Sequence, residues 1–148
     1  MCISYGALIW GSNYKTKLKP IFILQKRALR AITFSDYRAP SKPIFERLQI
    51  LNIYEIVQYQ LGEIAFKYET NQIPTIFRCY FKNLRSVHNH NTRSRSAGNF
   101  YLSKQRLNYG KFGLKYAAAK VWNSIPAEIR KSSSNKIFKY SYKNHILS

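Results

Sequence analysis

Apolar residues recur every three or four positions in several stretches of the chain, the spacing that places side chains on one face of an α-helix. Residues 16–34 show it most clearly, and a second long stretch covers about 53–69. Shorter stretches follow at about 41–48, 111–122 and 136–147. We therefore predict a mainly α-helical protein in which several short C-terminal helices follow a helical N-terminal part.

Start signals indicate where some of these helices begin. Asn52 precedes the second long stretch and Ser41 opens the first short one, and both residue types are good helix N-caps. Pro20 fits a helix only in the first turn, because proline lacks an N–H group. The faces that we expect to be buried are Leu18, Ile21, Phe22, Gln25, Ala28, Leu29 and Ile32 in the first long helix and Ile53, Val57, Leu61, Ile64 and Tyr68 in the second.

The segment 82–111 interrupts the helical pattern. It is polar, basic and rich in Asn and Ser, and its part Asn99–Leu107 alternates loosely between apolar and polar residues. Alternation is typical of strands, so we predict a small β-hairpin there. The chain of 148 residues is long enough for one domain. We predict a single unit over 1–148, with a helical part at 1–81 and a basic C-terminal extension at 82–148.

The charge of the chain is strongly unbalanced. There are 25 Lys and Arg against 6 Asp and Glu, and the formal net charge is +19. No acidic residue lies between Glu69 and Glu128, a stretch with many cations and aromatic rings. Such a surface attracts an external polyanion, and the interleaved rings favour nucleic acid over a membrane or an acidic protein. The cations include Arg78, Lys82, Arg85 and Lys120, and the rings include Tyr80, Phe81, Phe100, Tyr101, Tyr109, Phe112 and Tyr116.

Arginine and lysine side chains are the candidates for phosphate contacts, because their ammonium and guanidinium groups donate charged hydrogen bonds to phosphate oxygens. The rings offer surfaces on which unpaired bases stack, although each ring is also a candidate for the core. The basic face of residues 16–34 is either a solvated helix surface or a second phosphate-facing stripe. The candidate nucleic-acid-binding residues are Arg93, Arg95, Lys104, Arg106, Lys111 and Lys115, with Lys26, Arg27 and Arg30 as second choices.

Residues for catalysis are scarce. Asp36 is the only aspartate, and the glutamates form no clear pair for two-metal phosphoryl chemistry. His88 and His90, with Cys79 upstream, fall short of the usual four zinc ligands, so we expect no metal site and no cofactor. Cys2 and Cys79 make no disulfide framework, and no apolar run approaches the ~18 residues that span a bilayer. We expect an intracellular protein, in cytoplasm or nucleus, without a membrane or small-molecule partner.

Several short motifs occur in an order typical of one family. They are Tyr5 with Ile9-Trp10-Gly11, Leu24-Gln25-Lys26-Arg27-Ala28-Leu29-Arg30-Ala31-Ile32, Pro43-Ile44-Phe45, Phe66-Lys67-Tyr68, His90-Asn91-Thr92-Arg93, and Lys120-Val121-Trp122-Asn123-Ser124-Ile125-Pro126 with Ile129-Arg130. In this order they resemble the C-terminal part, downstream of the palm, of the reverse transcriptase of LINE-type (non-LTR, jockey-like) retrotransposons. The resemblance covers essentially the whole chain, and residues 24–32 are its most specific stretch.

The resemblance implies a thumb-like helical region at 1–81 and a basic extension that together hold RNA and the RNA–DNA primer duplex. The palm with its aspartate motif is missing, so this chain alone is expected to have no polymerase activity. Met1 falls inside the family pattern, which implies a truncated open reading frame or a fragment of an element. Two alternatives stay open: a non-functional remnant of a decayed element, and a domesticated basic nucleic-acid-binding protein.

Overall fold

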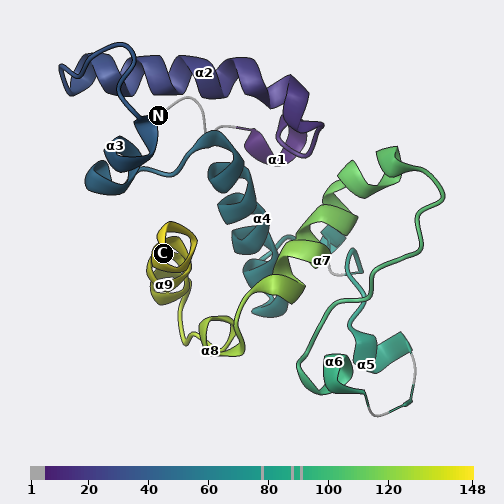
Figure 1. Cartoon of the computed structure of the whole chain (residues 1–148). Helices are drawn as coiled ribbons and strands as arrows, with labels where there is room; N and C mark the ends of the chain where they lie inside the picture. The colour runs from purple at the N-terminus through teal and green to yellow at the C-terminus, as the bar shows by residue number, and fades with distance from the viewer. Residues whose placement is uncertain (1–5, 78, 88, 91) are drawn as a thin grey trace.

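The computed structural model describes residues 6–77, 79–87, 89–90 and 92–148 (Figure 1). Within these ranges the chain is mainly helical, as the sequence predicts. Cys2, Tyr5, Arg78, His88 and Asn91, which the sequence analysis named, lie outside the described residues. The α-helices are α1 (Ala7–Trp10), α2 (Lys15–Ile32), α3 (Ser41–Leu48), α4 (Ile53–Glu69), α5 (Leu84–Val87), α6 (Arg93–Ser96), α7 (Leu114–Ser124), α8 (Ala127–Arg130) and α9 (Asn135–Leu147), and the 3-10 helices are η1 (Thr75–Phe77) and η2 (Asn108–Phe112).

Helix α4 is the centre of the main core, and α1, α7 and α9 pack against it (Figure 1). Phe66 of α4 stacks on Phe138 of α9, with 4.2 Å between ring centroids. The ring of Tyr68 of α4 meets the ring of Phe100 edge-on, with 5.5 Å between ring centroids. Aromatic rings therefore supply much of the buried surface that joins the N-terminal and C-terminal halves. The buried residues of this core are Ala7, Val57, Leu61, Ala65, Phe66, Phe81, Phe100, Ala118, Ala119, Trp122, Ile125, Phe138 and Tyr142.

Helices α2 and α3 form a smaller cluster in which Leu29, Ile44 and Phe45 are buried. Gln25 of α2 ties this pair to the start of α4. Its amide nitrogen donates to the carbonyl of Leu51 at 2.9 Å, and its amide oxygen accepts from the N–H of Ile53 at 3.0 Å. A buried amide that satisfies both of its polar groups costs little and fixes the angle between the two helices.

The two expected helix caps have different outcomes. The Asn52 side chain accepts from the N–H groups of Tyr54 and Glu55, and the Glu55 carboxylate accepts from the Asn52 N–H, which completes a capping box. Helix α4 therefore starts where the sequence predicts. The prediction for Ser41 is wrong, because Ser41 is the first residue of α3 and Pro40 occupies the N-cap position without a side-chain bond.

Helix α2 also differs from the sequence prediction. It begins at Lys15, so Pro20 lies inside the helix rather than in its first turn. The face expected to be buried is narrower than predicted, because Ala28 and Ile32 are exposed, Ile32 by 68%. Among the described elements, α3 and α4 make the main contacts with α2, and on its buried face Leu18, Gln25 and Leu29 are covered.

The predicted β-hairpin at Asn99–Leu107 is not formed. In the described part of the chain, pairing is limited to one antiparallel bridge between Asn83 and Phe100. The backbone groups of Phe100 face away from Asn83, and the amide side chain of Asn123 bonds both of them, so the outer edge of this segment pairs with no strand. A helix side chain thus takes the place of the second strand.

Candidate nucleic-acid interface

A basic loop, defined here as residues 83–99, leaves the core and returns to it at neighbouring points. The N–H of Leu84 donates to the carbonyl of Asn99 at 3.0 Å, and the N–H of Tyr101 donates to the carbonyl of Lys82 at 2.7 Å. The loop carries α5 and α6 and projects away from the central helices (Figure 1). Its ends are fixed, so its cations are held at one end of the molecule.

The end of α7 holds the extended segment that follows this loop. Phe100 donates its N–H to the Asn123 Oδ1 atom at 2.8 Å, and Asn123 donates its Nδ2 group to the Phe100 carbonyl at 3.0 Å. Next to it, the indole N–H of Trp122 donates to the carbonyl of Gly98 at 3.3 Å. Trp122 and Asn123 therefore tie the basic loop to the main core through consecutive side chains.

Arg130 of α8 also serves the base of the loop. Its Nη1 group donates to the Asn99 Oδ1 atom at 2.8 Å, and its guanidinium carbon lies 5.6 Å from the centroid of the Trp122 ring. Burial lowers the pKa of Arg130, and the negative charge of Glu69 acts in the opposite direction. The charge of Arg130 is thus used within the fold, unlike the charges of the cations on the loop surface.

The two arginines of α6 differ in whether their side chains are already hydrogen-bonded within the protein. The guanidinium group of Arg95 donates to the carbonyl of Asn89 at 2.7 Å, and its backbone N–H donates to Thr92, which caps the short helix. The side chain of Arg93 is exposed and has no partner among the described residues. Of this predicted pair, Arg93 is free to contact a phosphate, whereas Arg95 first holds the loop in shape.

A small cleft lies beside the base of the loop, and it brings one of the predicted cations together with several residues from other elements. Its volume is about 140 Å³. The residues that line it are Lys82, Tyr101, Ser103, Lys115 and Tyr116. Lys115 and Tyr116 come from α7, and the other three come from the two extended segments that meet at the bridge. We refer to these five residues as the lysine–tyrosine cleft.

Sequence reasoning found this cleft only in part. Lys115 is one of the predicted contact residues, but Ser103 did not stand out, and Lys82, Tyr101 and Tyr116 appeared only as members of a wider basic and aromatic field. The alternating pattern at Asn99–Leu107 carried the missing signal. Residues two apart in an extended segment face the same side, which places Tyr101 and Ser103 together.

The other predicted cations of the C-terminal half lie on the chain between the cleft and α7. Lys104 and Arg106 are exposed, and neither has a side-chain partner among the described residues. Lys111 of η2 is exposed and donates to the Asn108 Oδ1 atom at 2.9 Å. These cations extend the basic surface along the segment that follows the cleft.

Lys26, Arg27 and Arg30 form a separate group on α2. Figure 1 places the C-terminal half of α2 at the opposite end of the molecule from the basic loop. The ammonium group of Lys26 lies 4.7 Å from the centroid of the Phe22 ring, and Arg30 donates to the carbonyl of Ala39 at 2.9 Å. The nine predicted residues therefore do not converge on one site.

The aromatic residues divide between core and surface. Phe81 and Phe100 are buried and stack on each other at 5.1 Å, so these two rings are unavailable to bases. Tyr101 and Tyr109 are 41% and 79% exposed. Only exposed rings such as these two offer a face on which an unpaired base can stack.

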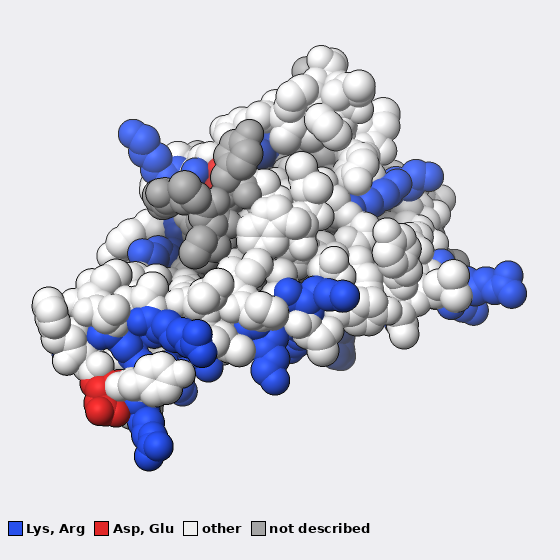
Figure 2. Space-filling model, turned by 90° about the horizontal axis from the view of Figure 1, so that it is seen from above, with Lys and Arg blue, Asp and Glu red and all other residues white. Residues whose placement is uncertain are grey.

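Few acidic groups compensate the positive charge. Ion pairs in the described ranges join carboxylates only to Lys42, Lys67 and Lys139. Figure 2 shows Lys and Arg side chains spread over one face of the molecule, where acidic side chains occupy little of the surface in view. Within those ranges, none of the nine predicted contact residues is paired with an acid.

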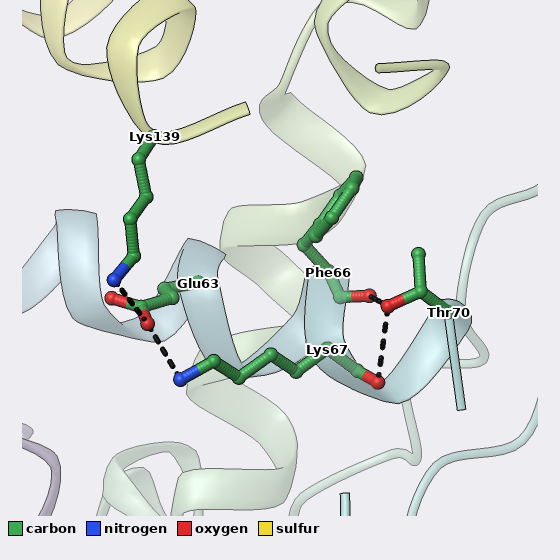
Figure 3. Close-up of polar contacts among 5 residues, drawn as sticks. All are labelled: Glu63, Phe66, Lys67, Thr70 and Lys139. Atoms are coloured by element: carbon green, nitrogen blue, oxygen red, sulfur yellow. Dashed lines mark hydrogen bonds and ion pairs between the residues drawn. The ribbon is translucent and has the colours of Figure 1, made fainter. Parts of the chain in front are cut away.

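Glu63 of α4 is the best-paired carboxylate of the described residues. Lys67 on the same helix and Lys139 on α9 donate to its Oε1 atom at 2.6 and 2.8 Å (Figure 3). Burial would raise the pKa of Glu63, but the two ammonium groups outweigh burial and leave the pKa below its ordinary value. The hydrogen bond to Glu63 in turn raises the pKa of Lys139. This triad joins α9 to the central helix.

We expect Glu63→Gln to lower the free energy of unfolding by about 1 kcal/mol at neutral pH, because hydrogen bonds to charged groups are lost at a partly exposed site. The pKa of Glu63 is depressed in the folded state, so its contribution is present at neutral pH and fades as pH falls through that pKa. Urea unfolding followed at a series of pH values should show the difference between the two proteins shrinking as the pH falls below the ordinary pKa of a glutamate, about 4.3.

Glu46→Gln is the matched control for this experiment. Glu46 pairs with Lys42 one turn away at 3.7 Å, and both side chains are well exposed. Exposed pairs at this spacing contribute little. A difference between wild type and Glu63→Gln that stays constant with pH would contradict the assigned role of the triad.

Within the described residues, no three His, Cys, Asp or Glu side chains come close enough together to hold a metal ion, and Cys79 is a free, exposed thiol. None of the helices described is both long enough and apolar enough to cross a bilayer. In comparisons with known proteins, no family model, curated protein or solved structure matches the chain.

Proposed function

We propose that the chain binds nucleic acid, RNA and RNA–DNA duplex included, mainly through contacts to phosphates. The observation that carries this proposal is the uncompensated charge of the C-terminal half. Lys104, Arg106 and Lys115 are exposed and have no acidic partner in the described part of the chain. A compact protein with a net charge of +19 repels itself, and a polyanion relieves that repulsion on binding.

The resemblance to the C-terminal part of LINE-type reverse transcriptases supports the same proposal. The motif His90-Asn91-Thr92-Arg93 supplies Thr92 and Arg93 of the basic loop, and the motif Lys120–Pro126 supplies Trp122 and Asn123, which tie this loop to the core. We therefore propose that the chain acts as a holding module for template and primer, without polymerase chemistry of its own. An aspartate-pair motif encoded in frame upstream of Met1 would support this origin, whereas an in-frame stop codon there would count against it.

The expected result is binding that weakens steeply with salt. Each neutralised phosphate releases counterions, so five contacts on single-stranded RNA would give a slope of log K against log salt of about −3.5. Fluorescence anisotropy with labelled single-stranded RNA, RNA–DNA duplex and a heparin competitor measures this slope. Absence of binding at low salt, or binding that does not respond to salt, would refute the proposal.

Two charge-matched variants assign the contacts to one end of the molecule. We expect Lys104→Gln/Arg106→Gln to make the slope shallower by about 1.4, because two phosphate contacts disappear. Lys26→Gln/Arg27→Gln removes the same charge from α2, and we expect a smaller change there because Lys26 already rests on Phe22. Equal changes in both variants would show that net charge alone, rather than the C-terminal surface, determines binding.

A further inference from the structure

We infer that the lysine–tyrosine cleft binds one unpaired nucleotide of a single strand, an inference that rests on the proposed function. Its phosphate lies between the ammonium groups of Lys82 and Lys115, and its base stacks on Tyr101. The cleft combines two cations, a hydroxyl group and two tyrosine rings within about 140 Å³. Stacking platforms beside cations are the features by which proteins hold single strands.

The size of the cleft indicates part of a polymer rather than a free small molecule. Pockets that enclose small ligands measure roughly 300–1,000 Å³, and the cleft holds about 140 Å³. It has room for one group of a nucleic-acid strand that continues along the protein surface on both sides of the cleft. Lys104 and Arg106, on the segment that leaves the cleft, are exposed cations that can take the neighbouring phosphates.

The lining residues are held in position by the fold. The bond from the Tyr101 N–H to the Lys82 carbonyl, at 2.7 Å, fixes these two residues relative to each other. The ammonium group of Lys115 lies 5.9 Å from the centroid of the Tyr80 ring, a cation–π contact that restricts its movement. The Ser103 hydroxyl accepts from Gln105 at 2.7 Å, and its own hydrogen is left to donate to a phosphate oxygen.

An unpaired strand fits this arrangement better than a duplex. A ring stacks on a base only when that base has lost one of its neighbours in the stack. Tyr101 is 41% exposed, so part of its ring is available to a base. The cleft therefore adds a preference for unpaired nucleotides to a surface whose cations also bind duplexes.

The test compares labelled oligouridine with an RNA duplex of the same length, bound to the full chain. We expect Tyr101→Ala to weaken oligouridine binding about 10-fold and to leave duplex binding unchanged. Tyr101→Phe should retain wild-type affinity, because the ring remains. Tyr109→Ala removes a more exposed ring outside the cleft and should have no effect. Equal losses in Tyr101→Ala and Tyr109→Ala, or equal losses on both nucleic acids, would overturn the inference.

Two further measurements test the inference: one tests the phosphate contact, and the other uses the wild-type chain, so that misfolding of a variant cannot affect it. Lys82→Gln/Lys115→Gln should make the salt slope for single-stranded RNA shallower by about 0.7, because the two lysines share one phosphate contact. Lys131→Gln/Lys136→Gln removes the same charge elsewhere and should leave the slope unchanged. Photocrosslinking of 4-thiouridine RNA to the wild-type chain needs no variant and should label the Tyr101 peptide; label found only elsewhere would overturn the inference. If the wild type binds no nucleic acid, the proposed function fails; if it binds without these effects, only the cleft fails.

Discussion

Trp122→Ala is expected to destabilise the protein by about 3–5 kcal/mol, the usual cost of truncating a large buried aromatic residue. The Trp122 side chain is 2% exposed and stacks on Phe100 at 5.5 Å. Its indole N–H also satisfies the carbonyl of Gly98 at the base of the basic loop. Domains are stable by only about 5–15 kcal/mol, and the net charge of +19 works against this one, so the variant should keep only a small part of its stability and unfold at a much lower urea concentration.

Urea unfolding monitored by far-UV circular dichroism measures this loss. Tyr109→Ala is the matched control, because its ring is 79% exposed and its removal should change stability by less than about 0.5 kcal/mol. A folded Trp122→Ala protein with wild-type stability would contradict the packing described for α7.

Heparin should raise the unfolding midpoint of the wild type, since a ligand that binds the folded state stabilises it.

Gly62→Ala is expected to destabilise the protein by about 3 kcal/mol, even though alanine is the better helix former by about 1 kcal/mol. Gly62 lies in the buried part of α4, and an added Cβ atom would overlap the Cε1 atom of Tyr142. The Tyr142 ring cannot move aside easily, because it stacks on Phe138 at 5.4 Å and on Tyr59 at 6.0 Å. Overlap within this stack outweighs the gain in helix propensity.

A double-mutant cycle tests the cause of this effect. In a Tyr142→Leu background the ring is absent, so Gly62→Ala should lose most of its cost and can become stabilising. Thermal unfolding of the wild type, both single variants and the double variant gives the coupling energy. An equal cost of Gly62→Ala in both backgrounds would show that the clash with Tyr142 is not its source.

Features of the fold that depend on residues close in sequence were predictable, and features that depend on contacts between distant residues were not. Helix α4 is found where the sequence predicts it, because its apolar period and the Asn52 cap are local signals. The exposed side of α2 was not predictable, since Ile32 matches the apolar period and only the limited reach of α3 leaves it uncovered. The hairpin failed for a similar reason: the partner of Phe100 is a side chain 23 residues away, and no periodic pattern reports such a contact.

The candidate site was predictable in its composition rather than in its arrangement. A cation without a nearby acid is visible in the sequence, and Lys115 was found in this way. The separation in space between α2 and the basic loop, by contrast, depends on how the helices pack, which composition does not encode (Figure 1). The use of Arg95 and Arg30 to hold backbone carbonyls is also a tertiary effect, and it reduces their availability to phosphate.

The amide of Asn123 has a consequence for self-association. An extended segment that presents free N–H and C=O groups is a template on which another chain can add as a strand, and this is a common route to aggregation. Asn123 occupies the N–H and the C=O of Phe100, a buried residue of the extended segment that follows the basic loop. The two hydrogen bonds that position the loop therefore also leave Phe100 without free backbone groups to which a second molecule could add a strand.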